Sequence, residues 1–134
     1  TGHQGNPVNG ITLQHRESRE LDLPGLVSAL GVEDVAVVNP MDLKATRAAL
    51  KAAAQNADEL SVIIFCSPCV LLSKTHEPAL VVSSDCRACG ACTLIGCPAI
   101  SRDEDGKAHI DANLCVGCEQ CSQTCAFGCI GKAE

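Results

Sequence analysis

The feature that most constrains this chain is the density of cysteine between residues 86 and 129, where nine of its eleven cysteines lie. Cys86 begins the run Cys-Arg-Ala-Cys-Gly-Ala-Cys-Thr-Leu-Ile-Gly-Cys-Pro, and Cys115 begins the run Cys-Val-Gly-Cys-Glu-Gln-Cys-Ser-Gln-Thr-Cys. In each run, two residues separate the first cysteine from the second and the second from the third. Four residues then separate the third cysteine from the fourth in the first run, and three do so in the second run. Thiolates with this spacing hold iron–sulfur clusters, and the fourth thiolate of each run characteristically serves the other cluster.

The two runs form an internal repeat, which predicts two halves related by a pseudo-twofold axis. Each half is expected to contain a loop, a short helix and a strand. Short strands are predicted at Leu80–Val82 and Lys107–Asp111, with a turn at Asp103–Gly106 before the second. A helix that begins just after each third cysteine would direct the fourth cysteine inward. Because the first run has one extra residue before Cys97, we expect a small bulge at the start of its helix.

The spacing also decides between metals. Structural zinc is held by pairs of cysteines, whereas here three cysteines follow one another twice. We therefore expect two [4Fe-4S] clusters, with zinc and redox disulfides as the alternatives. One cluster is assigned Cys86, Cys89, Cys92 and Cys125, and the other is assigned Cys115, Cys118, Cys121 and Cys97.

Three cysteines lie outside these ligand sets. Cys66-Ser-Pro-Cys69 has the spacing of a redox pair, but the proline and the adjoining strand are also compatible with buried, inert thiols. Cys129 is expected to pack as a small apolar residue under a cluster. Gly90 and Gly117 are expected to let the loop backbone approach inorganic sulfides, where N–H groups raise the reduction potential. Ordinary turn glycines are the alternative for these two positions.

Composition excludes several classes of protein. The formal net charge of −6 leaves few basic residues to neutralise phosphates, which argues against general nucleic-acid binding. The sequence contains no apolar run long enough to span a membrane and no signal-peptide pattern. An odd number of closely spaced cysteines argues against a secreted disulfide scaffold. We therefore expect a cytoplasmic protein that binds neither nucleic acid nor a membrane.

The first half of the chain has an α/β pattern. The sequence predicts a helix over Asp22–Gly31, a strand over Val35–Val38, a helix over Asp42–Ala54 and a strand over Glu59–Phe65. Helices that alternate with strands through short connections indicate a parallel α/β layer. Two strands cannot form a doubly covered sheet unaided, so this half is expected to be the last portion of a larger α/β domain.

Four segments give the chain a family resemblance. They are Thr1–Gln4, Gly31–Leu43, Pro68-Cys69 and Gly96–Ile100, of which the last includes the wider spacing before Cys97. In these segments the chain resembles the C-terminal part of the large subunit of indolepyruvate ferredoxin oxidoreductase. That family belongs to the thiamine-diphosphate-dependent 2-oxoacid:ferredoxin oxidoreductases.

The resemblance implies two domains. Residues 1–78 would be the C-terminal portion of a thiamine-diphosphate-binding α/β domain, and residues 79–134 an α+β bacterial-type ferredoxin-like domain with two [4Fe-4S] clusters. The implied reaction is the oxidative decarboxylation of arylpyruvates to an acyl-CoA and carbon dioxide, with electrons relayed to ferredoxin. The implied partners are ferredoxin, a smaller catalytic subunit, the remainder of the large subunit, CoA and the 2-oxoacid.

The resemblance assigns no catalytic or thiamine-binding residue to this chain. The Gly-Asp and Asn residues that hold magnesium and the diphosphate are expected before Thr1, so the fragment alone is not expected to catalyse decarboxylation. Since the chain opens on Thr1 rather than Met, we expect it to be a piece of a longer protein. Two other functions stay open: a stand-alone ferredoxin-like electron carrier and a zinc-stabilised interaction module.

Overall fold

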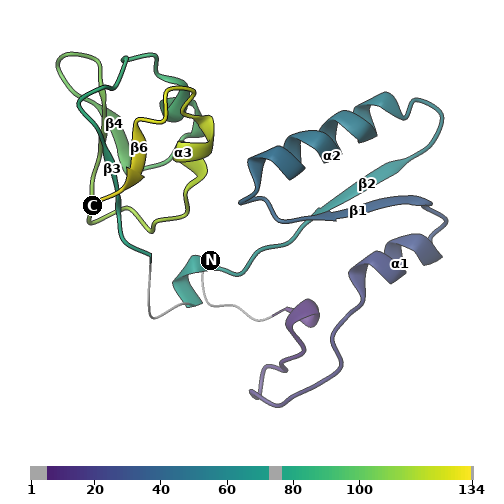
Figure 1. Cartoon of the computed structure of the whole chain (residues 1–134). Coiled ribbons are helices and arrows are strands. Elements are labelled where there is room, and N and C mark those ends of the chain that lie inside the picture. The colour runs from purple at the N-terminus through teal and green to yellow at the C-terminus, as the bar shows by residue number, and fades with distance from the viewer. Residues whose placement is uncertain (1–5, 73–76, 134) are drawn as a thin grey trace. The chain divides into compact units, whose positions relative to one another are not determined.

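The computed structural model describes residues 6–72 and 77–133 (Figure 1). The chain divides into two compact units, Thr1–Leu72 and Ser73–Glu134. This division falls a few residues before the boundary at residue 78 suggested by the sequence. The segment Thr1–Gln4, one of the four that carry the resemblance, lies outside the described residues.

In the first unit, α-helices alternate with strands in the predicted order. α1 spans Leu23–Ala29, β1 spans Asp34–Val38, α2 spans Leu43–Gln55 and β2 spans Ser61–Phe65; short 3₁₀ turns occur at Pro7–Asn9 (η1) and Val70–Leu72 (η2). β1 and β2 run parallel, with Asp34 opposite Ser61 and Val38 opposite Phe65. α2 makes the crossover between the two strands (Figure 1), so the predicted parallel α/β pattern is confirmed.

Side-chain caps explain where these helices begin. Asp22 accepts a hydrogen bond of 3.0 Å from the N–H of Gly25, and Asp42 accepts one of 2.9 Å from a backbone N–H in the first turn of α2. Each carboxylate satisfies a donor that the helix itself leaves without a partner. α1 ends close to Gly31, whose φ of +92° reverses the chain in a way that ordinary residues resist.

A small polar cluster ties the elements of this unit together. Asn56, at the end of α2, donates to Asp34 Oδ2 at 3.1 Å and to Ser61 Oγ at 3.2 Å. The Ser61 hydroxyl also donates to Asp34. These bonds hold the first residues of β1 and β2 against the end of the crossover helix. They also lower the pKa of Asp34, the Ser61 hydroxyl more than the Asn56 amide, because both stabilise the carboxylate.

The first unit buries little apolar surface. Val38 is its one buried hydrophobic residue within the described part of the chain. Its neighbour Val37 is 56% exposed, and Leu50 of α2 and Phe65 of β2 are about half exposed. A layer this thin leaves apolar side chains uncovered, as expected of a portion of a larger α/β domain.

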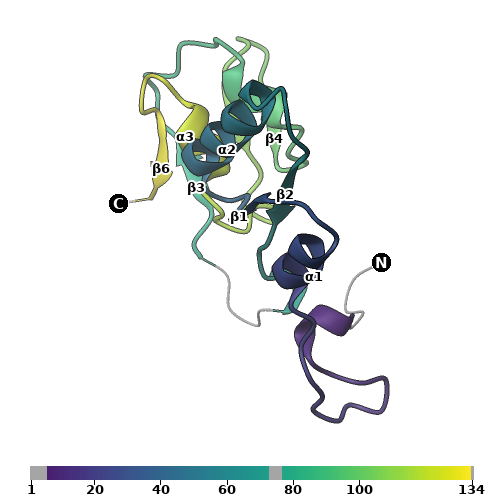
Figure 2. The same cartoon turned by 90° about the vertical axis from the view of Figure 1, so that its right-hand side faces the viewer.

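The second unit is built from much shorter elements. They are β3 Leu80–Val82, η3 Ala91–Ile95, β4 Ile100–Arg102, β5 Ala108–Ile110, α3 Gln120–Thr124 and β6 Ile130–Lys132. β3 pairs with β6 and β4 pairs with β5, both antiparallel. The two halves are therefore β3-η3-β4 and β5-α3-β6, and each half pairs its first strand with the last strand of the other. This exchange is the arrangement that a pseudo-twofold axis produces, and β3, β6 and α3 lie close together in both views (Figure 1, Figure 2).

The helices of the second unit differ from expectation in two details. Each begins one residue before the third cysteine of its run, at Ala91 and Gln120, rather than after it, and the first is a 3₁₀ helix. The bulge expected at the start of the first helix is wrong. The extra residue is accommodated at the opposite end, where Gly96 caps the helix with a φ of +73°. A glycine adopts this left-handed conformation without a steric penalty.

The core of the second unit includes thiols. Leu80 is 2% exposed and packs in one cluster with Ile130, Cys92 and Cys121. Partly buried residues of β3, η3, β4 and β5 pack against this cluster, among them Val82, Ile95, Ile100, Ala108 and Ile110. The third cysteine of each run is thus a core residue, and the strand pairs hold both helices in place around it.

Candidate metal centre

Five thiols line one cavity of the second unit, and four of them belong to the two cysteine runs. The cavity is lined by three cysteines of the first run and by Cys125 of the second run. Cys125 caps the C-terminal end of α3, so α3 carries it across to the first run. These four residues are the set assigned to one cluster from their spacing: Cys86, Cys89, Cys92 and Cys125.

Exposure repeats between the two runs. In each run the first cysteine is half-buried, the middle cysteine is exposed, the third is buried and the fourth is half-buried. The exposed pair is Cys89 and Cys118, and the buried pair is Cys92 and Cys121. The sequence repeat is therefore also a repeat of cysteine burial. We expect the two runs to bind the same kind of metal centre.

The pKa values of the thiols follow from this packing. Burial raises the pKa of Cys92, and the neighbouring thiols Cys125, Cys86 and Cys89 raise it further. Thiols that influence one another in this way favour a cationic centre, which would replace their protons and neutralise several thiolates together.

Cys125 differs from Cys92. Burial alone would raise the pKa of Cys125, but backbone N–H groups of Cys129, Phe127 and Gly128 lower it by more, so the net pKa is depressed. The Cys129 N–H lies 3.3 Å from Cys125 Sγ. The loop after α3 is therefore folded to favour a thiolate at this position.

The second run repeats this picture in part. Burial, together with the neighbouring thiols Cys118 and Cys115, raises the pKa of Cys121 to about 11. Cys97 follows Gly96 at the end of η3, and η3 and α3 lie against each other. The placement of Cys97 as fourth ligand of this set stays a prediction.

The donor chemistry fits a cluster of several metal ions. Within residues 6–72 and 77–133, no group of three or more His, Cys, Asp or Glu side chains is arranged to hold a single metal ion. A cubane binds each of its four thiolates through a different iron, so its ligands stand farther apart than those of one ion. The four thiols of the first set line one cavity and would hold such a cluster through their Sγ atoms.

Left-handed residues shape both loops at equivalent positions. Ala88 and Gly117 precede the middle cysteines, and Gly90 and Glu119 follow them, all with φ between +53° and +77°. Such a conformation costs a residue with a Cβ about 1–2 kcal/mol, which the rest of the fold must offset. The two loops therefore share one backbone conformation around the middle cysteine, with Ala88 strained in the first run and Glu119 strained in the second.

The two glycines also make room for other parts of the unit. A Cβ on Gly90 would collide with the Arg102 guanidinium, and a Cβ on Gly117 would lie 2.8 Å from the carbonyl oxygens of Glu77 and Pro78. These contacts were not anticipated from the sequence, because they join residues far apart along the chain. The expected approach of the loop backbone to inorganic sulfides stays a prediction.

The three remaining cysteines divide into two groups. Cys129 is buried, lines the same cavity as the first set and donates from Sγ to the Phe127 carbonyl at 3.6 Å. Cys66 and Cys69 belong to the first unit and are both exposed. The interpretation of Cys66 and Cys69 as buried thiols is therefore wrong.

The helices of the described residues include none that is long and apolar enough to cross a membrane. No family model and no solved structure matches the chain.

Curated relatives do match the chain. It is 34% identical over 137 residues to the indolepyruvate oxidoreductase subunit IorA of Thermococcus kodakarensis, covering 95% of this chain and 21% of that protein. The subunit of the same name from Archaeoglobus fulgidus is 34% identical over 141 residues, covering 100% of this chain and 22% of the relative. That of Methanothermobacter thermautotrophicus is 36% identical over 131 residues, covering 96% and 20%. The chain thus spans about a fifth of the length of the curated relatives it matches.

Two antiparallel strand pairs around two cysteine-bearing helices fit a ferredoxin-like domain. The curated relatives of the chain are named as subunits of an oxidoreductase. The chain is homologous to one part of the indolepyruvate oxidoreductase subunit IorA. The family resemblance inferred from the sequence is thereby confirmed.

Proposed function

We propose that this chain is the electron-transfer part of a 2-oxoacid:ferredoxin oxidoreductase that acts on indolepyruvate or a related arylpyruvate. Residues 79–134 would bind two [4Fe-4S] clusters and relay electrons to ferredoxin. The observation that carries the proposal is the cavity whose lining includes four thiols from two separate runs. When bound, the clusters supply one-electron carriers between the oxidised substrate and the acceptor.

The residues of the chain have separate tasks in this proposal. The buried thiols Cys92 and Cys121 would anchor each centre in the core, where burial excludes water. The exposed thiols Cys89 and Cys118 would lie on the side from which an electron acceptor can approach. The ligand sets are those assigned from the spacing, with Cys97 and Cys125 exchanged between the runs.

Other cofactors and partners belong to the intact enzyme. Residues 1–78 would form the end of a thiamine-diphosphate-binding domain, whose uncovered apolar faces need the rest of the large subunit. Thiamine diphosphate, Mg²⁺, CoA, the 2-oxoacid and a smaller catalytic subunit would be bound outside this chain. The cytoplasm, where thiols stay reduced, is the compartment that suits these cysteines.

Metal analysis tests the first step. The reconstituted chain should contain about eight irons and eight acid-labile sulfides, with a broad visible absorption that dithionite bleaches. A colourless protein that holds zinc would instead establish the zinc-stabilised module. To separate the enzyme from a stand-alone carrier, the chain should be tested for copurification with the remainder of an IorA-type subunit. A chain that occurs free of other subunits in the cell, and is reversibly reduced and oxidised there, would favour the stand-alone carrier.

A substitution tests the exchanged ligands. Cys125→Ala should damage the centre held by Cys86, Cys89 and Cys92 and leave the other intact, lowering iron content from about eight to about four per chain. Cys66→Ala, in the first unit, is the matched control and should leave the iron content unchanged. Selective loss of the centre at Cys115 would contradict the exchange.

A further inference from the structure

The two cysteine runs are alike in backbone but opposite in charge. Gly90 and Glu119 occupy equivalent positions, each directly after the middle cysteine of its run, with φ of +77° and +60°. Arg102 and Lys132 are also equivalent, since each is the last residue of the strand that follows its run, β4 or β6. Each half therefore places one basic side chain near the same left-handed residue.

In the first half this basic side chain has no anionic partner. Arg102 occupies the space that a Cβ on Gly90 would fill, and its Nη2 donates to Thr93 Oγ1 at 3.4 Å. No carboxylate among the described residues forms an ion pair with Arg102. Arg87 also lines the cavity of the first thiol set, whose described lining includes no Asp or Glu. Two arginines thus line the cavity of the first set.

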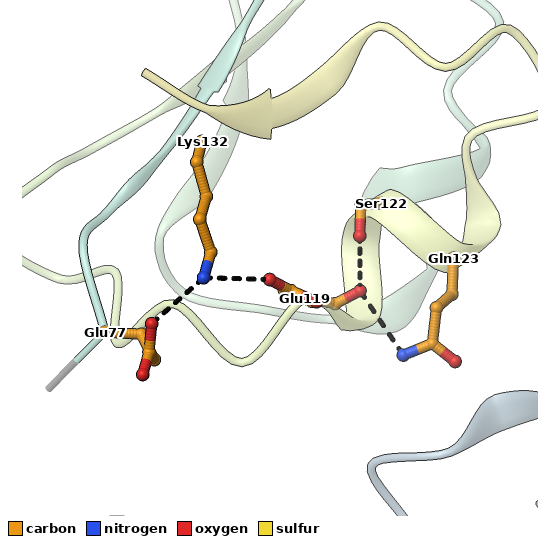
Figure 3. Close-up of polar contacts among 5 residues, drawn as sticks. All are labelled: Glu77, Glu119, Ser122, Gln123 and Lys132. Carbon is orange, nitrogen blue, oxygen red and sulfur yellow. Dashed lines mark hydrogen bonds and ion pairs between the residues drawn. The ribbon is translucent and has the colours of Figure 1, made fainter. Parts of the chain in front are cut away.

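In the second half the basic side chain is neutralised twice (Figure 3). Lys132 Nζ lies 3.0 Å from Glu77 Oε2 and 3.6 Å from Glu119 Oε1. Glu119 directly follows Cys118, and its carbonyl accepts a hydrogen bond of 2.7 Å from the Ser122 hydroxyl. Two carboxylates and one ammonium leave this side of the second run with a net negative charge.

A hydrogen bond adds to the difference. The Cys129 N–H donates to Cys125 Sγ at 3.3 Å, and Cys125 belongs to the first thiol set. A donor aimed at a thiolate sulfur stabilises extra negative charge on the centre that the thiolate holds, and this raises its reduction potential. The two guanidinium groups and this N–H act in the same direction.

We propose that the thiol set Cys86, Cys89, Cys92 and Cys125 holds the cluster of higher reduction potential, and that the unpaired Arg102 is a main cause. This inference rests on the proposed function, because it requires a cluster at each run. One-electron reduction adds one negative charge, which a nearby cation stabilises and a nearby carboxylate disfavours. Electrons that enter this unit then collect at the first set.

A redox titration of the reconstituted chain with dithionite, followed by electron paramagnetic resonance, tests the proposal. Two midpoint potentials are expected. Arg102→Gln should lower the more positive one by about 59 mV, which is a tenfold change in the one-electron equilibrium constant, and Arg102→Lys should restore most of it. Lys132→Gln is the matched control, and it should lower only the more negative midpoint because it leaves Glu77 and Glu119 uncompensated.

Each outcome has a definite meaning. Two coincident midpoints, or an Arg102→Gln effect on the more negative midpoint or on neither, would overturn the inference while the iron content still upholds the proposed function. An Arg102→Lys variant that behaves like Arg102→Gln would also overturn it, because packing rather than charge would then be responsible. A reconstituted chain without iron would overturn the inference and the proposed function together.

Discussion

The two units of this chain are stabilised in different ways. The first has regular secondary structure, with a 13-residue helix and two five-residue strands, yet it buries little apolar surface. The second has strands of three residues and helices of five, yet it contains a compact core that includes two cysteines. Short elements cannot stabilise themselves, so the proposed clusters would be a main source of stability for the second unit.

This contrast separates local from long-range causes of structure. In the first unit, caps such as Asp42 and a strong helix-forming sequence specify the elements within a few residues. In the second unit, strands such as β3 and β6 come from opposite ends of the unit and form only when the whole unit closes. The second unit should therefore respond strongly to loss of metal, and the first should not.

Metal removal should give the largest effect. With the proposed clusters extracted by an iron chelator, the second unit is expected to lose its fold, because binding free energy is folding free energy in small metal-dependent domains. Hydrogen exchange measured by mass spectrometry should show β3 and β6 exchanging at unfolded rates while β1 and β2 stay protected. Helical circular dichroism should largely persist, since α1 and α2 contain most of the α-helical residues. Equal loss of protection in both units would contradict the comparison.

A cavity in the second core should have the next largest effect. Leu80→Ala removes the most buried side chain of that core and is expected to cost about 2–5 kcal/mol of unfolding free energy. Val81→Ala, on the same strand but 47% exposed, is the matched control and should cost much less. Denaturant unfolding of the reconstituted chain measures both. Similar costs for the two variants would show that the core is not packed around Leu80.

Within the first unit, loss of the Asp34 charge in acid should have the smallest effect of the three. Hydrogen bonds from Ser61 and Asn56 depress the pKa of Asp34 below its ordinary value of 3.8. Its contribution to stability is therefore present above pH 3.8 and is lost as pH falls through the lower pKa of the folded state. NMR titration of the Asp34 carboxyl carbon should show the depressed pKa, and Ser61→Ala should return it toward the ordinary value. A midpoint unchanged by Ser61→Ala would contradict the assignment.

Sequence reasoning succeeded where local patterns are strong. The helix at Asp42, the strand at Val35 and the parallel order of the first unit follow from capping, periodicity and short connections. The burial expected of that strand is wrong, since only Val38 of its residues is buried. The strands β4 and β6 were missed because Ile100-Ser-Arg and Ile130-Gly-Lys are too short to show a period. Their existence depends on pairing with β5 and β3.

The candidate site divides in the same way. Spacing alone named four of the five thiols that line one cavity, because cysteine spacing reflects how a loop wraps around a metal centre. The charges around that cavity could not be predicted. Arg102 reaches Gly90, and Lys132 reaches Glu77, only after the strands have brought distant residues together.

The pairing of β3 with β6 has a consequence for how the second unit can be combined with other domains. Leu80 and Lys132 stand opposite each other in this pair, so the polypeptide enters and leaves the unit at neighbouring points. A domain with adjacent ends can be inserted into a host protein with little disturbance to the fold of either. For the same reason it tolerates circular permutation. A unit with this topology can thus be joined to unrelated proteins by short connections, without redesign of its interior.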